Sequence, residues 1–315
     1  YHLALNEFEP IIKIVSKETN FSNITVDTSI YEYIDDILDI IKNKEDYKDI
    51  AQRLINTKIY ITLHHLIPIN AVCDCNRCLN YISQVPFLKD DKKLINSICA
   101  QKAHSLLNSG MNYEGTLLLN ELQVKIMINE SEFDYQSIFD ITDRLCAVYI
   151  KFNCYNIALE YSNLEIKIAT ENHDDSLLAI AYRTRSKLFY LRNYDECIHS
   201  LNLVDRYLQD SKQNRIWLNN CIYKKIVELS YNINCDNNSI AETEIIVKKA
   251  QDCHFNRTYI QGNFLLSALY LKRGTPHDLL KAEFKAKAAL DGSIRFGISS
   301  YLWQLYNITA IINLR

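Results

Sequence analysis

The sequence predicts an all-α protein built as an array of repeated helix pairs. Only 6 Gly and 4 Pro occur among 315 residues, too few for the turns of a many-stranded sheet. Apolar residues recur at spacings of three and four, which is the period of an amphipathic helix. A short turn signature also recurs along the chain, and such repetition is typical of a helical solenoid.

Composition and charge exclude several classes of function. Hydrophobic content of 48% and charged content of 23% are those of a folded chain. The net charge of −3 argues against nucleic acid as a partner, because phosphate-binding surfaces need clustered basic excess. No apolar run approaches the roughly 18 residues of a membrane span, so no membrane partner is expected. Ten cysteines without a signal peptide indicate reduced thiols and a cytoplasmic protein.

Residues 1–86 predict a small helical N-terminal region. Apolar residues from Tyr33 to Ile41 follow the i, i+3, i+4 spacing, which places a helix from Ser29 onward. Ile50, Leu54 and Ile55 support a second helix. The segment 56–69 is rich in β-branched residues and fits either a buried helix or a strand.

The stretch 145–168 predicts two helices folded back on each other across a short turn. Tyr155 marks the turn, and Ala158 is small enough for the two helices to approach closely. The apolar stripes are Leu145, Cys146 and Tyr149 in the first helix, and Ala158, Tyr161, Leu164 and Ile168 in the second.

Variants of this unit recur downstream of Pro86. The turns read Asn112-Tyr113-Glu114, Cys154-Tyr155-Asn156 and Asn193-Tyr194-Asp195, with Thr116, Ala158 and Cys197 three residues after each tyrosine. Further copies place Ile240 and Leu279 at the tyrosine position, followed by Thr243 and Ala282. The anchors 113, 155, 194, 240 and 279 are separated by 42, 39, 46 and 39 residues.

A turn of this kind, with a small residue three positions on and apolar residues four and seven beyond it, resembles the tetratricopeptide repeat. Leu145, Cys146 and Tyr149 match the first-helix pattern of that family apart from its glycine. The resemblance implies a right-handed α-α superhelix over residues 87–315, with about five to six helix pairs and an incomplete last pair. The period exceeds the roughly 34 residues of the family, which implies longer helices like those of bacterial sensor proteins.

The sharpest local cluster of candidate ligands lies in the N-terminal region. His64 and His65 precede a Cys-x-Cys-x-x-Cys run formed by Cys73, Cys75 and Cys78. Zinc takes four such nitrogen and sulfur ligands in a tetrahedron, so a structural zinc ion is one interpretation. The other is three reduced thiols near the start of a helix, with no cofactor.

The resemblance also implies that the first helices form a concave groove for a peptide. When the positions of the repeat family are carried over to this sequence, the residues of the groove are Gln101, Ser105, Asn108, Asp143, Lys151, Tyr182, Ser186 and Tyr190. The alternative is that these are solvated polar residues, with the tyrosines half-buried between repeats.

Signals of catalysis are poor. The chain lacks a phosphate loop, a Gly-x-Ser-x-Gly turn and a His-Glu-x-x-His helix. Neighbouring acids such as Asp35 and Asp36 point about 100° apart on a helix and do not share a site. No enzymatic activity is therefore expected of this chain, apart from a zinc-dependent alternative centred on the His/Cys cluster.

The predicted function is a non-catalytic protein- or peptide-binding module, expected to be the sensor or regulatory part of a larger bacterial signalling or defence protein. The alternative is a self-association scaffold. Residues 31–49 carry seven acids against three lysines, and residues 272–287 carry five basic residues against two acids. Opposite charges of this kind favour head-to-tail contacts between copies.

Overall fold

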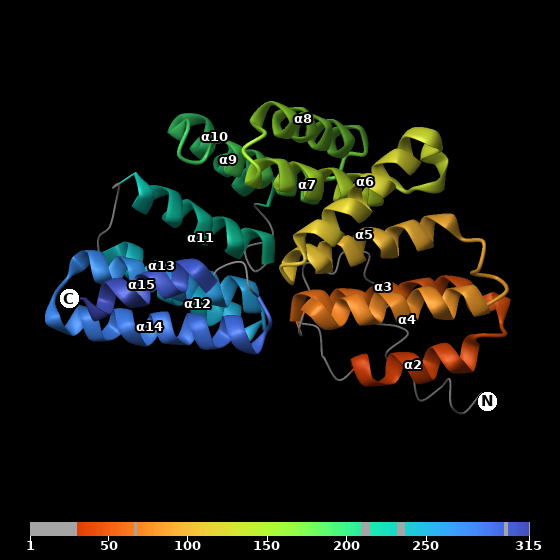
Figure 1. Ribbon diagram of the computed structural model, residues 1–315, viewed down its shortest axis with the longest axis horizontal. Coiled ribbons are helices and arrows are strands. Elements are labelled where there is room, and N and C mark those ends of the chain that lie inside the picture. Colours follow the sequence, from red (N-terminus) through yellow and green to blue (C-terminus); the bar gives the residue numbers. More distant parts are fainter. Residues whose placement is uncertain (1–29, 66–67, 209–214, 232–236, 299–301, 315) are drawn as a thin grey trace. The chain divides into compact units, whose positions relative to one another are not determined.

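The computed structural model describes residues 30–65, 68–208, 215–231, 237–298 and 302–314, without the side chains of residues 30, 32, 64, 65, 68 and 69. These residues form fourteen α-helices and no strand (Figure 1). The all-α prediction is therefore confirmed, and the ambiguous segment 56–65 is helical. The helices are α2 (Ile30–Ile41), α3 (Lys48–His65), α4 (Pro68–Gln84), α5 (Lys92–Asn108), α6 (Asn112–Ile128), α7 (Tyr135–Lys151), α8 (Tyr155–Glu171), α9 (Asp175–Phe189), α10 (Tyr194–Tyr207), α11 (Arg215–Ser230), α12 (Asn237–Asp252), α13 (Asn256–Arg273), α14 (Pro276–Arg295) and α15 (Leu302–Asn313).

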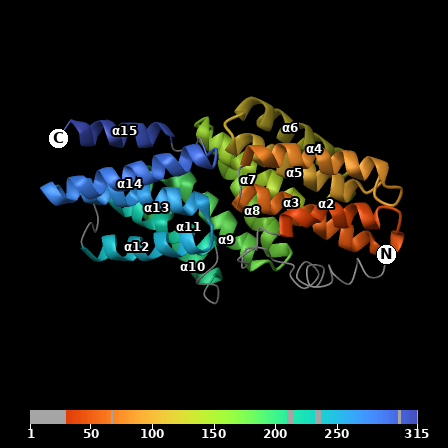
Figure 2. The same cartoon turned by 90° about the horizontal axis from the view of Figure 1, so that it is seen from below.

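The helices pack mainly on their neighbours in sequence, as in a helical solenoid. They form two compact units with a boundary between Ile138 and Phe139. In the first unit α3 packs on α4, α4 on α5, and α5 on α6. In the second unit α13 lies beside α14, and α15 beside α14 (Figure 2). The sequence predicted a division at residue 86, where the repeat pattern starts. The packing of the helices instead divides the chain between Ile138 and Phe139.

The repeat signature marks the start of the second helix in each pair. Helices α8 and α10 begin at Tyr155 and Tyr194, and the later anchors fall in the first turns of α12 and α14. The small residues behind four of the anchors are buried: Ala158, Cys197, Thr243 and Ala282. The first copy differs from its prediction. Tyr113 is exposed and Thr116 is half-buried, and the buried small residue of α6 is Gly115, beside Leu107 of α5.

The ends of several helices explain how the chain turns with so few glycines. At five helix ends an amide donates to the carbonyl five residues back: Met111 to Leu106, Cys154 to Tyr149, Asp174 to Ala169, Phe255 to Ala250 and Ile298 to Ser293. This is the closing bond of the Schellman motif, which needs a left-handed residue. Asn153, His173 and His254 adopt that conformation with φ of 59°, 52° and 54°. Asn and His tolerate it better than most residues, so these three ends do not require glycine, whereas Gly110 and Gly297 adopt it at the other two.

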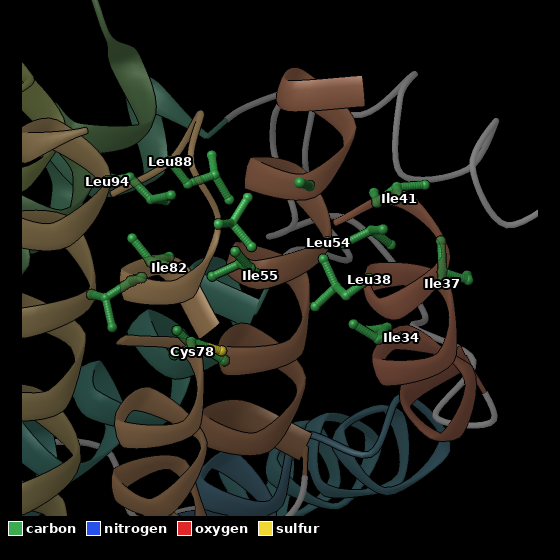
Figure 3. Close-up of a cluster of buried hydrophobic side chains, with 14 of the residues drawn as sticks. Ile34, Ile37, Leu38, Ile41, Leu54, Ile55, Cys78, Ile82, Leu88 and Leu94 are labelled. Carbon is green, nitrogen blue, oxygen red and sulfur yellow. The ribbon is translucent and has the colours of Figure 1, made fainter. Parts of the chain in front are cut away.

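An apolar cluster from four helices holds the first unit together (Figure 3). Ile34, Ile37, Leu38 and Ile41 of α2 point toward Leu54 and Ile55 of α3, and Cys78 and Ile82 of α4 lie on the other side of α3. The predicted stripe of α2 is thus buried, except for Tyr33, which is exposed.

In the second unit the two helices of a pair approach closely at small residues. Cys146 of α7 donates a thiol hydrogen bond to the carbonyl of Ala158 at 3.2 Å. Ser267 of α13 makes the equivalent contact with the carbonyl of Ala282 at 2.8 Å. A side chain as short as Cys or Ser reaches the backbone of the facing helix only where the two helices approach closely, so these positions mark the closest approach within a pair.

One predicted core position of α8 is wrong. Leu164 is exposed, whereas the neighbouring Ser162 and Glu165 are fully buried. The buried face of α8 is therefore rotated by one residue from the apolar stripe read from the sequence. A polar side chain on a buried face indicates that other polar groups lie near it.

No helix in the described part of the chain has both the length and the apolar content that crossing a bilayer requires. The absence of a membrane partner was predicted from the same property of the sequence.

The close packing of α12 and α13 predicts a strong effect of a single methyl group at Gly262. A Cβ atom there would overlap Cγ2 of Val247. We expect Gly262→Ala to lower the free energy of unfolding by about 1–3 kcal/mol, as overpacked cores do, although alanine normally stabilises a helix interior. Urea denaturation of Gly262→Ala in the wild-type and Val247→Ala backgrounds measures this. A loss of equal size in both backgrounds would refute the overlap as its cause.

Candidate functional site

The first helices of the pairs in the second unit, α7, α9, α11 and α13, form a row joined by polar side chains. We call it the first-helix row. Three hydrogen bonds link its members, and their partners lie 41, 40 and 39 residues apart, which is the repeat period. The bonds join Thr184 to Asp143 at 2.5 Å, Tyr190 to Ser230 at 2.6 Å and Thr258 to Asn219 at 2.6 Å. The row is thus held partly by polar contacts between equivalent positions of successive repeats.

Five basic side chains gather on this row. We call them the basic cluster: Arg144 of α7, Arg183 and Lys187 of α9, Arg215 of α11 and Arg257 of α13. Arg257 is exposed and the other four are half-buried. The sequence disperses these residues over more than a hundred positions, and the stacking of the helices brings their charges within range of one another.

The electrostatics of the basic cluster show how crowded these charges are. Burial, followed by the charge of Arg183, lowers the pKa of Lys187 to about 7. Burial and the charge of Arg215 lower the pKa of Arg183 to about 10, so its guanidinium stays protonated at neutral pH. Lys187 is therefore the member of the cluster whose charge changes near neutral pH.

Two buried acids, Asp143 and Glu165, interact with the charges of the cluster. Asp143 accepts hydrogen bonds from Thr184 at 2.5 Å and pairs with Arg144 at 2.7 Å. Burial acts to raise the pKa of Asp143, but Arg144, Lys187 and Thr184 outweigh it and hold the pKa below its ordinary value. Burial and the charge of Asp143 raise the pKa of Glu165 well above its ordinary value, which favours its neutral form. Asp143 is thus a carboxylate whose charge acts on both Lys187 and Arg183.

Hydrogen bonding in the cluster is incomplete as well. The Nε atoms of Arg144, Arg183 and Arg215 are buried, and none has an acceptor among the described residues. A buried donor without an acceptor costs about 1–3 kcal/mol. Both carboxyl oxygens of the buried Glu165 likewise lack a donor among the described residues, so donors and acceptors are both left unpaired here.

The predicted groove residues do not all lie at an open surface. Ser105 and Ser186 are fully buried, and each hydroxyl donates within its own helix, to the carbonyls of Gln101 and Arg183. Asp143 is buried too. These three are corrected from exposed contacts to internal polar groups. The side chain of a serine or aspartate at these positions can form its hydrogen bond within its own helix or with a neighbouring helix of the row. The sequence pattern does not reveal which of these occurs.

The remaining groove residues are accessible in part. Gln101 and Asn108 of α5 are half-buried in the first unit, so the eight residues are divided between units that are described separately. Lys151 is exposed on α7. Tyr182 stacks on Tyr207 of α10 with ring centroids 5.8 Å apart. The hydroxyl of Tyr190 shares a hydrogen bond with Ser230 of α11. Whether these residues contact a ligand stays a prediction.

Sequence reasoning overlooked all five residues of the basic cluster. Arg144 and Arg183 occupy equivalent positions of successive repeats, 39 residues apart (183 − 144). Alignment of the repeats beyond their turn signature would have shown that basic residues recur on the first helices. Glu165 was missed because the apolar Leu164 beside it matched the expected stripe.

The cysteine run lies on α4, where the helix separates its members. Cys73 is exposed, whereas Cys75 and Cys78 are buried. Burial raises the pKa of Cys75 above its ordinary value and that of Cys78 to about 12, which favours neutral thiols over metal-binding thiolates. Among the described side chains no three His, Cys, Asp or Glu residues are placed to hold a metal ion. The side chains of His64 and His65 lie outside those described, so structural zinc stays a prediction for metal analysis of the purified protein.

Comparison with known proteins adds little to this geometry. No protein-family model matches the chain. Reticulocyte-binding protein homolog 1 of Plasmodium falciparum (isolate 3D7) is 27% identical over 278 residues. The match covers 80% of this chain and 9% of that protein, so the chain spans less than a tenth of its length. A similarity of this size does not assign a family.

The pKa of Lys187 predicts a stability that depends on pH. In the unfolded chain a lysine keeps a pKa near 10.4, so between about pH 7 and 10 the unfolded state binds more protons and stability rises with pH. The charged groups that act on Lys187 are Arg183 on its own helix, Arg144 and Asp143 on α7, Glu165 on α8 and Arg257 on α13.

We expect Lys187→Met to stabilise the fold by about 1 kcal/mol at pH 6.5 and by less at pH 9.5, because it removes a charge that is costly only when protonated. Thermal unfolding at both pH values measures this. Lys248→Met, on the exposed side of α12, is the matched control and should show no such pH dependence. Destabilisation by Lys187→Met at pH 6.5 would contradict the crowding of positive charge.

Proposed function

We propose that the chain is a non-catalytic binding module that holds a protein or peptide segment on the first-helix row of the second unit. The observation that carries the proposal is the first-helix row itself, where α7, α9, α11 and α13 are joined by hydrogen bonds at the repeat period and carry the basic cluster. Stacked helix pairs expose one helix of each pair along a continuous face, which suits an extended ligand.

The resemblance to tetratricopeptide repeats supports the same use of this face. The turn signature marks the starts of the second helices, and the small residues behind it are buried in four copies. The Plasmodium relative is named as a binding protein, which is compatible with the proposal. We further propose a cytoplasmic setting and a place within a larger bacterial signalling or defence protein, with any catalysis carried by another part.

Peptide selection tests the proposed function. We expect a random peptide library, panned on the immobilised chain, to yield peptides that bind with micromolar or lower dissociation constants. Arg257→Glu should weaken that binding at least tenfold, because it reverses an exposed charge at the site. Lys248→Glu on α12 makes the same change of charge on the same unit and should leave binding within about twofold. Selected peptides that respond equally to both variants would place the binding surface elsewhere.

Exposed apolar side chains on α14 and α15 favour self-association as a second candidate function. Leu280 and Phe284 of α14 and Trp303 and Tyr306 of α15 are exposed by 66%, 69%, 65% and 55%. Leu280 and Phe284 lie one turn apart on α14, as do Trp303 and Tyr306 on α15, and exposed apolar side chains that adjoin one another mark contact surfaces. The opposite charges of residues 31–49 and 272–287 suit a second copy of the chain as the occupant.

Sedimentation distinguishes this candidate. A charge-assisted contact between copies should loosen as salt rises from 50 to 500 mM, and Trp303→Ser should weaken it further. A monomer at every salt concentration and at a protein concentration of 100 μM would exclude self-association as the main function.

A further inference from the structure

Two parallel rows of side chains reach the surface along the first half of α14. Leu280 and Phe284, exposed by 66% and 69%, form an apolar row. His277, Lys281 and Lys285 follow one another at four-residue spacing and form a basic row beside it, because residues at this spacing share one side of a helix. At 1.5 Å per residue, the basic row is about 12 Å long. We call the two rows together the α14 face.

The α14 face borders a hollow that also includes residues of α12 and α13. The volume of the hollow is about 260 Å³, and its lining consists of the five residues of the face together with Glu244 and Tyr270. The hydroxyl of Tyr270 donates to Glu244 at 2.7 Å, so this carboxylate already has a partner. Sites for small molecules are larger, at roughly 300–1,000 Å³. A hollow of this size therefore suits one large side chain of another protein segment.

The two lysines of the α14 face have no carboxylate partner among the described residues. The ammonium of Lys281 lies over the ring of Tyr270, 5.4 Å from its centroid, and Lys285 forms no ion pair in that part of the chain. Arg273 at the end of α13 differs from them, because it is bound to Asp278 at 2.8 Å. The α14 face is thus an apolar surface with positive charges that are open to an outside carboxylate.

The first unit presents the opposite charge along α2, the 3-10 turn Glu45–Tyr47 and the start of α3. Residues 31–49 carry seven acids against three lysines. Tyr33 is 45% exposed and lies three residues before Asp36, on the same side of α2. Four exposed carboxylates of this region have no partner among the described residues: Asp36, Glu45, Asp46 and Asp49. We call these four residues and Tyr33 the α2 surface.

We propose that the α14 face of one molecule binds the α2 surface of a second copy of the chain, with Tyr33 in the hollow and carboxylates against Lys281 and Lys285. The inference rests on self-association, the second candidate function, and names the two surfaces in contact.

The two surfaces complement each other in charge and in the spacing of their groups. One helical turn separates Tyr33 from Asp36, about 4.5 Å along the axis of α2. A tyrosine ring in the hollow therefore places a carboxylate near its lining, where Lys281 and Lys285 lie. Tyrosine is among the residues that most often anchor an interface, and opposite charges around it fix the orientation of the partner.

The contact joins two different surfaces, so each molecule keeps one of them free for a further copy. A contact of this kind builds rings or open chains, whereas a contact between two identical surfaces stops at a dimer. We therefore expect assemblies of the wild-type chain to grow beyond a dimer as the protein concentration rises.

Charge reversal on both surfaces tests the proposal by sedimentation of the whole chain in 50 mM salt. Lys281→Glu with Lys285→Glu should weaken association at least tenfold, and so should Asp36→Lys with Asp46→Lys, because each pair of changes places like charges in contact. All four changes in one chain make the charges opposite again and should restore association to within about tenfold of the wild type.

A matched control and an apolar variant complete the experiment. Lys89→Glu with Lys248→Glu makes the same change of net charge at exposed positions outside both surfaces and should leave association within about twofold. Tyr33→Ser and Phe284→Ser should each weaken association at least tenfold, and together by less than the product of the two effects, because they remove one shared contact. Thermal unfolding followed by circular dichroism shows that each variant is folded.

Failure of the inference is distinguishable from failure of self-association. If the wild-type chain associates and Lys281→Glu with Lys285→Glu leaves that association unchanged, the contact lies elsewhere and the inference is refuted. If each double variant weakens association but the four changes together do not restore it, the two surfaces do not meet and the inference is again refuted. If the wild-type chain is a monomer at 100 μM, self-association and the inference both fail, while peptide binding on the first-helix row is unaffected.

Discussion

The close approach of two helices at small residues is the constraint on which the rest of this structure depends. A single helix pair cannot bury both of its apolar faces, so each pair needs its neighbours. Cys146 against Ala158 and Ser267 against Ala282 bring the helices of a pair close enough for side chain to reach backbone. That spacing leaves the first helices of successive pairs in a row, where they contact one another through residues about one repeat apart. The site of interest is a consequence of this packing.

Polar contacts within the row have two opposite effects. Thr184 with Asp143 and Thr258 with Asn219 satisfy buried groups and join neighbouring repeats, which is favourable because each donor has its acceptor. The basic cluster in the same row is different, since the buried Nε atoms of Arg144, Arg183 and Arg215 have no acceptor among the described residues. Proteins retain unfavourable arrangements of this kind mainly where a ligand completes them, and a more stable variant is then expected to bind less well.

Much of the architecture could be predicted from sequence because helical periodicity and turn chemistry are local. The stripe of α2 apart from Tyr33, the turn at Tyr155 and the small residues of four repeats were predicted correctly. The candidate site was predicted poorly for a physical reason. A polar residue such as Ser186 bonds within its own helix and points inward, and burial, followed by the charge of Asp143, raises the pKa of Glu165 and favours its neutral form. Neither outcome depends on the residues adjacent in sequence.

By itself the sequence determined three properties: the all-α fold, the positions where the helix pairs begin, and the small residues that let the two helices of a pair approach. These properties follow from spacings of a few residues. Only the tertiary structure decided which side chains share a site. The basic cluster draws Arg144, Arg183, Arg215 and Arg257 from four helices, and their charges act together only because the repeats stack. Coulomb interactions depend on distance through space, and a repeat of about 40 residues hides that distance from the linear chain.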